Sequence, residues 1–179
     1  MTHSIIISGF GGQGVMLMGQ VLCQAGMTEG KHVTWLPSYG PEMRGGTANC
    51  TVIISDEPVA SPVVDNPEEV VVMNIPSLLK FEPIVRRDGY LFMNSSVIDR
   101  EPKRQDIKTI KVPANEIADQ LGNLRVANMV MLGAFVFTTK CVNIESLIDA
   151  MKYKLKGKDS SIIELNVEAI KQGLRHVGG

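Results

Sequence analysis

The stretch SIIISGFGGQG at residues 4–14, together with the apolar run at residues 15–27, decides the fold. An isoleucine-rich run that stops at a glycine is typical of a buried strand. The run after it is too long for a strand, and its Met, Leu and Gln residues favour a helix. Because polar residues are scarce in this helix, we expect both of its faces to be covered. The chain therefore opens as a strand, a glycine turn and a buried helix.

The remaining sequence alternates strand and helix patterns first and ends in helices. A second strand is expected at 32–36, where Pro37 stops it, and a third at 47–55. The connection between them is only about ten residues long, while a parallel crossover needs a dozen or more, so we expect this pair to be antiparallel. Further strands are predicted at 69–73, 89–93 and, with a weaker pattern, 109–112, and helices at 77–85, 126–139, 144–155 and 163–177.

This order predicts a three-layer, Rossmann-like α/β fold. We expect a mixed, mostly parallel sheet with helices on both faces. The length of 179 residues and the 44% hydrophobic content fit one ordinary core, so residues 1–179 are interpreted as a single domain.

Charge and hydropathy exclude several classes of protein. A net charge of −1 argues against a strongly basic nucleic-acid surface. The longest apolar stretch, residues 126–137, contains Asn128 and falls short of the ~20 residues that a membrane span needs. The amino terminus has neither the basic segment nor the cleavage site of a signal peptide. We therefore expect a soluble, cytoplasmic protein with no membrane span and no nucleic-acid partner.

The cysteines give no sign of a local metal centre. Cys23, Cys50 and Cys141 are far apart, and no two have the CxxC spacing of a zinc site or an iron–sulfur cluster. An odd count without a framework favours free thiols in a reducing compartment. The histidines have no Cys or Ser nearby that is arranged for nucleophilic catalysis. We expect no catalytic residue and no metal on this chain.

The segment at residues 9–14 matches the glycine motif G-x-G-x-x-G between a predicted strand and a predicted helix. Such glycines let the backbone approach a phosphate, and the helix start offers free N–H groups. A dinucleotide site also needs an acidic residue about 20 residues on, at the end of the second strand, and none stands there. A ligand-free turn, a different phosphate-bearing ligand and a subunit contact all remain open. If a ligand binds, Gly11, Gly12, Gln13 and Gly14 hold it.

A second glycine segment, YGPEMRGGT at residues 39–47, follows the second strand. Gly45 and Gly46 can form an anion nest, and Arg44 offers a planar cation suited to phosphate or carboxylate. In doubly wound sheets the second strand lies beside the first, so the two loops are expected to converge at one edge. A solvated surface loop, in which Glu42 and Arg44 bind nothing, is the alternative.

The two segments together, with VIIS at 52–55 and PVASP at 58–62, closely resemble the γ subunit of 2-oxoacid:ferredoxin oxidoreductases. The resemblance covers essentially the whole chain. It implies a multi-subunit enzyme that converts a 2-oxoacid to acyl-CoA and CO2. Thiamine diphosphate with Mg and iron–sulfur clusters would sit on partner α, β and ferredoxin-like δ subunits, with coenzyme A as co-substrate. The form of residues 39–46 looks most like the 2-oxoglutarate and branched-chain members.

The resemblance implies that this chain performs only part of the work of the enzyme. The Gly-Asp-Gly signature of a thiamine-diphosphate site is absent from the sequence. From the converging loops and their charge we expect the glycine loop, Arg44, Gly45 and Gly46 to form one surface for the nucleotide end of coenzyme A, with Tyr39 and Glu42 orienting the loop or meeting a partner; a glycine loop that only packs against a partner subunit is the alternative. A stand-alone phosphate- or nucleotide-binding module and a purely architectural subunit are the alternatives.

Small residues recur on the first helix at Gly19, Cys23 and Gly26, about one turn apart. Such a stripe allows another backbone to approach closely, either from a partner subunit or from the chain's own sheet. We expect a homo-oligomer when the chain is made alone and a hetero-oligomer with its partners.

Overall fold

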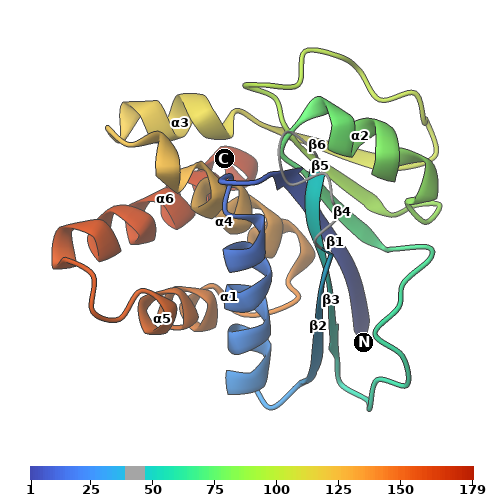
Figure 1. The fold of residues 1–179 in the computed structure, drawn as a ribbon, viewed down its shortest axis with the longest axis horizontal. Coiled ribbons are helices and arrows are strands. Elements are labelled where there is room, and N and C mark those ends of the chain that lie inside the picture. The colour runs from blue at the N-terminus through green and yellow to red at the C-terminus, as the bar shows by residue number, and fades with distance from the viewer. Residues whose placement is uncertain (39–46) are drawn as a thin grey trace.

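The computed structural model describes residues 1–38 and 47–179, and in these ranges it is an α/β fold (Figure 1). The elements follow one another as β1 (Thr2–Phe10), α1 (Val15–Thr28), β2 (His32–Ser38), β3 (Thr47–Ser55), β4 (Glu69–Val72), α2 (Ile75–Phe81), the short 3-10 helix η1 (Glu82–Ile84), β5 (Tyr90–Asn94), β6 (Lys108–Val112), α3 (Ala114–Gln120), the 3-10 helix η2 (Leu124–Val126), α4 (Ala127–Thr139), α5 (Ile144–Lys154) and α6 (Ser160–Gly178).

The six strands form one sheet in the order β2-β3-β1-β4-β5-β6. β1, β4, β5 and β6 pair in parallel, and β3 pairs antiparallel with both β1 and β2. The predicted mixed, mostly parallel sheet and the antiparallel pairing of β2 with β3 are confirmed. The expectation that the second strand lies beside the first is wrong. β3 folds back from β2 and takes the place next to β1 itself.

The two faces of the sheet are covered unequally, as Figure 1 shows. Side chains alternate along β1, so Ile5 and Ile7 join the larger core beneath α1 and α4, while Ile6 joins a smaller core beneath α2. Helices α1, α3, α4, α5 and α6 lie on the first side and α2 on the other. The prediction of helices on both faces is confirmed.

Helices α4 and α6 are packed backbone to backbone. A Cβ atom added at Gly133 would overlap the carbonyl oxygen of Ile170, and one at Gly173 would overlap that of Val130. Only glycine fits these two positions. Together with its other neighbours, this contact leaves α4 almost completely buried, which agrees with the apolar pattern predicted for it.

One local prediction, on Pro37, needs correction, and one left open, on the stripe of small residues, is answered. Pro37 lies inside β2 and does not end it, because β2 is an edge strand and a residue without an N–H is tolerated there. The small-residue stripe of α1 packs on its own sheet, since Gly19 meets Trp35 and Gly26 meets Val33. α3 was not predicted, because its sequence ANEIADQ has too few apolar residues for a helical stripe.

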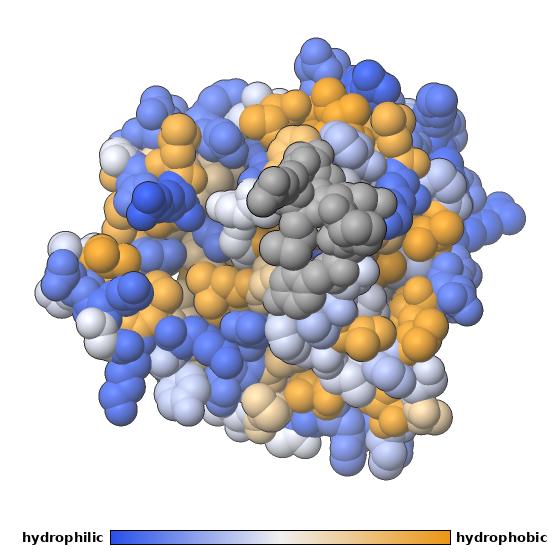
Figure 2. Space-filling view, viewed as in Figure 1, coloured by the Kyte–Doolittle hydropathy of each residue, from blue (hydrophilic) through white to orange (hydrophobic). Residues whose placement is uncertain are grey.

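No helix in the described part of the chain is long and apolar enough to cross a membrane. Figure 2 shows apolar side chains in separate patches among hydrophilic ones on the face drawn.

Candidate functional site

The glycine motif forms the turn that connects β1 to α1. The Gln13 backbone N–H donates to the Phe10 carbonyl at 3.2 Å. Gly12 (φ 91°) and Gly14 (φ 74°) both adopt the left-handed backbone region that favours glycine. Gly14 is the residue before α1, whose first N–H groups have no partner within the helix. The exposed backbone of Gly11 and Gly12 therefore lies next to the positive end of a helix dipole.

The Gln13 side chain ties this turn to the end of β4. Its Oε1 accepts from the Phe10 N–H at 2.6 Å, and its Nε2 donates to the Met73 carbonyl at 3.0 Å. Both polar atoms of the amide are thus used within the protein. Among the predicted site residues, Gln13 is placed to hold the turn in shape, while Gly11 and Gly12 keep their backbone open.

Asn128, at the start of α4, fixes the other side of the turn. Its Nδ2 donates to the Gly14 carbonyl at 3.4 Å, and its Oδ1 accepts from the Met129 N–H at 2.9 Å. A Cβ atom at Gly14 would overlap Asn128 Nδ2. Sequence reasoning noted Asn128 only as an interruption of an apolar run. Being the one polar side chain in residues 126–137, it could have been recognised as a candidate.

A cavity of about 210 Å³ lies against the turn, lined by Gly12, Gln13, Met73, Asn115, Leu124, Arg125, Ala127 and Asn128. No carboxylate is among these lining residues. Arg125 is exposed, and it forms no ion pair with any residue in the described ranges. Arg125 was not predicted as a site residue, because nothing in the local sequence pattern indicates that residue 125 lies near the end of β1. A helix start, two open glycines and one guanidinium suit an anion.

The second predicted loop falls outside the described residues. Tyr39, Glu42, Arg44, Gly45 and Gly46 all lie in the segment 39–46. Its two flanks are described: Thr47 pairs with Phe10, and Ser38 pairs with Asn49. Both flanks therefore stand at the edge of the sheet where β1 ends and the glycine turn begins. β3 separates β1 from β2, yet the shared edge that we predicted for the two strand ends is present.

The three cysteines are buried thiols in one core, Cys23 on α1, Cys50 on β3 and Cys141 just after α4. Burial raises the pKa of Cys23 and of Cys141 to about 12, and that of Cys50 to about 11. A metal cluster needs thiolates, so these side chains are poor ligands. They also do not line the cavity beside the glycine turn.

Comparison with known proteins places the chain in a family. The family model for pyruvate ferredoxin/flavodoxin oxidoreductase matches residues 4–176. Ketoisovalerate oxidoreductase subunit VorA of Methanothermobacter marburgensis is 44% identical over 168 residues, which is 93% of this chain and 35% of VorA. 2-Oxoglutarate synthase subunit KorC of the same organism is 36% identical over 159 residues, 85% of this chain and 86% of KorC. The chain spans about a third of the length of the VorA proteins that it matches.

Solved structures share the fold over almost the whole chain. The γ subunit of keto/oxoacid ferredoxin oxidoreductase from Geobacter sulfurreducens has a TM-score of 0.87 at 28% identity, covering 99% of this chain and 97% of that one. The 2-oxoglutarate:ferredoxin oxidoreductase from Magnetococcus marinus has a TM-score of 0.91 at 21% identity over 99% of this chain and 31% of that one, a likeness of fold alone. The chain therefore belongs to the pyruvate ferredoxin/flavodoxin oxidoreductase family, and the resemblance to γ subunits seen in its sequence is confirmed.

Proposed function

We propose that this chain is the γ subunit of a 2-oxoacid:ferredoxin oxidoreductase, folded as one domain over residues 1–179. The enzyme would oxidatively decarboxylate a 2-oxoacid, transfer the acyl group to coenzyme A and pass the electrons to ferredoxin. Its partners would be α, β and ferredoxin-like δ subunits in the cytoplasm. Family membership over residues 4–176 supports this assignment.

The part we assign to this chain is binding of the phosphate-bearing end of coenzyme A. The observation that carries it is the anion-compatible surface at the end of β1. Gly11 and Gly12 are exposed there beside the start of α1, and Arg125 faces the same cavity. Arg44, Gly45 and Gly46 would add a second cation and a second nest from the neighbouring loop. Phosphate oxygens match these donors in charge and geometry.

The other predicted residues have supporting roles in this proposal. Gln13 holds the turn through its bonds to Phe10 and Met73. Glu42 would orient Arg44 or pair with a partner subunit, because a carboxylate repels phosphate. Tyr39 would contact a partner or shape the loop.

The redox cofactors that the family implies do not fit this chain's described residues. The sequence lacks the Gly-Asp-Gly signature of a site for thiamine diphosphate with Mg. An iron–sulfur cluster would need several thiolates together, whereas the three thiols are buried in different elements and have raised pKa values. These cofactors therefore belong on partner subunits in our proposal. We expect the isolated chain to be colourless and inactive on 2-oxoacids.

Substrate choice would be made by pockets on other subunits. The relatives include a ketoisovalerate oxidoreductase subunit and 2-oxoglutarate synthase subunits. Together with the form of residues 39–46, they favour a branched-chain 2-oxoacid or 2-oxoglutarate over pyruvate. Activity of the co-purified complex with pyruvate, 2-oxoglutarate, a branched-chain 2-oxoacid and indolepyruvate tests this preference.

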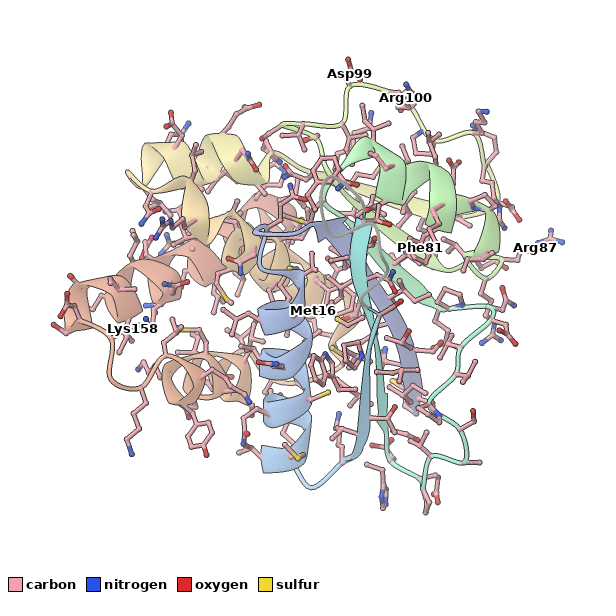
Figure 3. The ribbon with its side chains drawn as sticks, in the orientation of Figure 1. Met16, Phe81, Arg87, Asp99, Arg100 and Lys158 are labelled. Carbon is pink, nitrogen blue, oxygen red and sulfur yellow. The ribbon has the colours of Figure 1, made fainter. Side chains whose placement is uncertain are left out.

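The decisive experiment is Arg44→Ala in the assembled enzyme. Losing a charged hydrogen bond costs about 1.5–3 kcal/mol, so coenzyme A affinity should fall roughly ten- to a hundredfold. The KM for the 2-oxoacid should stay nearly unchanged. Arg87→Ala is the matched control, because Arg87 extends away from the body of the molecule in Figure 3. If the variant assembles and binds coenzyme A like the wild type, the chain is an architectural subunit.

A stand-alone phosphate- or nucleotide-binding module is the remaining alternative. Co-expression with candidate thiamine-diphosphate and ferredoxin-like subunits separates it from our proposal. We expect a hetero-oligomer in co-expression and a homo-oligomer when the chain is made alone. Sedimentation of a monomer at all concentrations, with no complex on co-expression, would contradict both expectations.

A further inference from the structure

At the opposite end of β1 lies a buried pair of titratable side chains that the proposed function does not use. His3 Nδ1 and Glu69 Oε1 are 2.8 Å apart, at the starts of the adjacent strands β1 and β4. The two residues are only 8% and 4% exposed. The parallel pairing of Ile5 with Glu69 brings them together. Charged and polar groups are rarely buried so deeply unless they have partners.

Each member of the pair has one polar atom left over. His3 Nε2 and Glu69 Oε2 are buried and have no hydrogen-bond partner among the described residues. Leaving such an atom without a partner is destabilising, and more so for a charged group. A cation bound beside the pair would give Glu69 Oε2 the partner that it lacks among the described residues.

A second carboxylate lies beside the pair. One ligand atom each from His3, Glu68 and Glu69 falls within a group whose members are all within 4.8 Å of one another. Glu68 is half-buried, and its Oε1 accepts from Arg86 Nη1 at 2.5 Å. Arg86 thus pairs with Glu68, while Glu69 has only His3 as a side-chain partner among the described residues.

The cluster opens into a cavity of about 510 Å³, lined by Met1, Thr2, His3, Glu68, Glu69, Arg86, Arg87, Asp88, Gly89 and Tyr90. A small ion can therefore reach the carboxylates. Arg87 borders this space, and its side chain projects outward from the molecule (Figure 3). Both unpartnered residues, His3 and Glu69, belong to the cavity lining.

We propose that His3, Glu68 and Glu69 form a binding site for a divalent transition-metal ion such as Zn²⁺. One imidazole nitrogen and two carboxylates are a ligand set typical of such ions, and two carboxylates balance a double positive charge. Ligand atoms on a tetrahedral zinc lie about 3.3 Å apart, given Zn–ligand distances of ~2.0 Å, so small rotations of Glu68 and Glu69 complete the geometry. The ion takes the place of the hydrogen between His3 Nδ1 and Glu69; a neutral imidazole then carries its proton on Nε2, and an imidazolium releases one proton to solvent.

The site is independent of the glycine turn. His3 and Phe10 are seven residues apart on one strand, which is roughly 23 Å at about 3.3 Å per residue. Metal binding can therefore be measured on the isolated chain without coenzyme A or partner subunits. Its failure would leave the proposed γ-subunit function untouched, and the reverse also holds.

The test is titration of the chelator-treated, untagged chain with Zn²⁺ by calorimetry, with Co²⁺ absorption as a second readout. We expect one saturable site per chain and visible Co²⁺ bands. His3→Gln and Glu69→Gln should weaken binding at least a hundredfold. Glu68→Gln should weaken it at least tenfold, and this residue is exposed enough for the variant to fold.

Two matched controls separate the site from surface binding. His32→Gln removes an exposed histidine, and Glu101→Gln removes an exposed carboxylate that pairs with Lys111. Neither should change Zn²⁺ affinity. If the wild type binds no Zn²⁺, or binds it equally well after Glu68→Gln and His3→Gln, the cluster is a structural pair and the proposal is wrong.

Discussion

The two ends of β1 differ in the charge that they attract. At its carboxyl end, open glycine backbone, the start of α1 and the Arg125 guanidinium are suited to an anion. At its amino end, His3 and two carboxylates lie together and are suited to a cation. The first surface is made largely of backbone groups and the second entirely of side chains. Substitutions at the first surface should therefore act mainly by changing the backbone conformation. Substitutions at the second should act by removing a ligand atom or a charge.

The largest effect that we expect concerns the cysteine thiols, which are not among the residues lining either cavity. With a pKa of about 12, Cys23 and Cys141 are ionised to roughly 0.01% at pH 8, against about 10% at the ordinary value near 9. Iodoacetamide should thus label them about a thousandfold more slowly in the folded chain than in 8 M urea. Mass spectrometry over time measures this. Complete labelling of the folded chain within minutes would show that burial does not keep these thiols protonated.

The next effect concerns charge at the carboxyl end. Arg125→Glu replaces a cation with an anion beside the glycine turn, and coenzyme A affinity of the assembled enzyme should fall about a hundredfold. Arg125→Lys keeps the charge and should recover most of the affinity. Titration of coenzyme A in the presence of a fixed 2-oxoacid concentration measures both variants. An Arg125→Glu enzyme with unchanged affinity would show that this cavity is not the phosphate surface.

The third effect that we expect is on stability, and two substitutions in the glycine turn separate the cost of backbone strain from the cost of steric overlap. Gly12→Ala places a side chain at positive φ in open space and should cost about 1 kcal/mol of unfolding free energy. Gly14→Ala adds overlap with Asn128 and should cost about 2–3 kcal/mol. Urea denaturation of both variants measures the difference.

The double variant Gly14→Ala with Asn128→Ala provides the control for this pair. If the overlap is the cause, the two costs should not add, because removing Asn128 makes room for the new methyl group. Additive costs would show that Asn128 does not constrain Gly14.

The smallest effect concerns Arg86 at the amino end. Its pair with Glu68 is largely exposed, so Arg86→Ala should lower stability by less than about 1 kcal/mol. Removing this cation frees Glu68, and Zn²⁺ affinity should rise about threefold. Calorimetry of Arg86→Ala beside wild type measures the change. Weaker Zn²⁺ binding in this variant would mean that Arg86 supports the site and does not compete for it.

Acid should destabilise the chain through the surface carboxylates. Partner groups lower the pKa of Asp106, through Arg104, and of Glu168, through Gln172 and Arg175. Carboxyls with a lowered folded pKa contribute stability that is present above their ordinary values near 4 and lost as pH falls below them. Urea midpoints should therefore hold from pH 7 to about 5 and decline below pH 4.

Local sequence patterns predicted most of the helices and strands. They could not predict which elements far apart in the chain lie side by side. The short connection before residue 47 was enough to predict that β3 runs against β2. It did not say that β3 also pairs with β1, because that contact joins residues more than thirty positions apart in the chain. Pro37 was misjudged for the same reason, since only the sheet order shows that β2 is an edge strand.

The candidate site was predictable only where one motif carried it. The glycine turn was found because its spacing has a direct backbone meaning. Arg125 of η2 and Asn128 at the start of α4 join it from more than a hundred residues later, and no pattern in the sequence connects them to the turn. The His3 and Glu69 pair is likewise a product of strand register, which places separate single residues side by side.

The packing of α4 against α6 has a consequence for synthesis on the ribosome. The chain emerges amino end first, so the sheet and α1 can associate while α6 is still being made. Until Ser160–Gly178 has emerged, one side of the apolar helix α4 has nothing to cover it. At roughly 5–20 residues per second, this interval lasts several seconds. Those seconds are when the nascent chain is most exposed to aggregation, because the uncovered side of α4 is apolar.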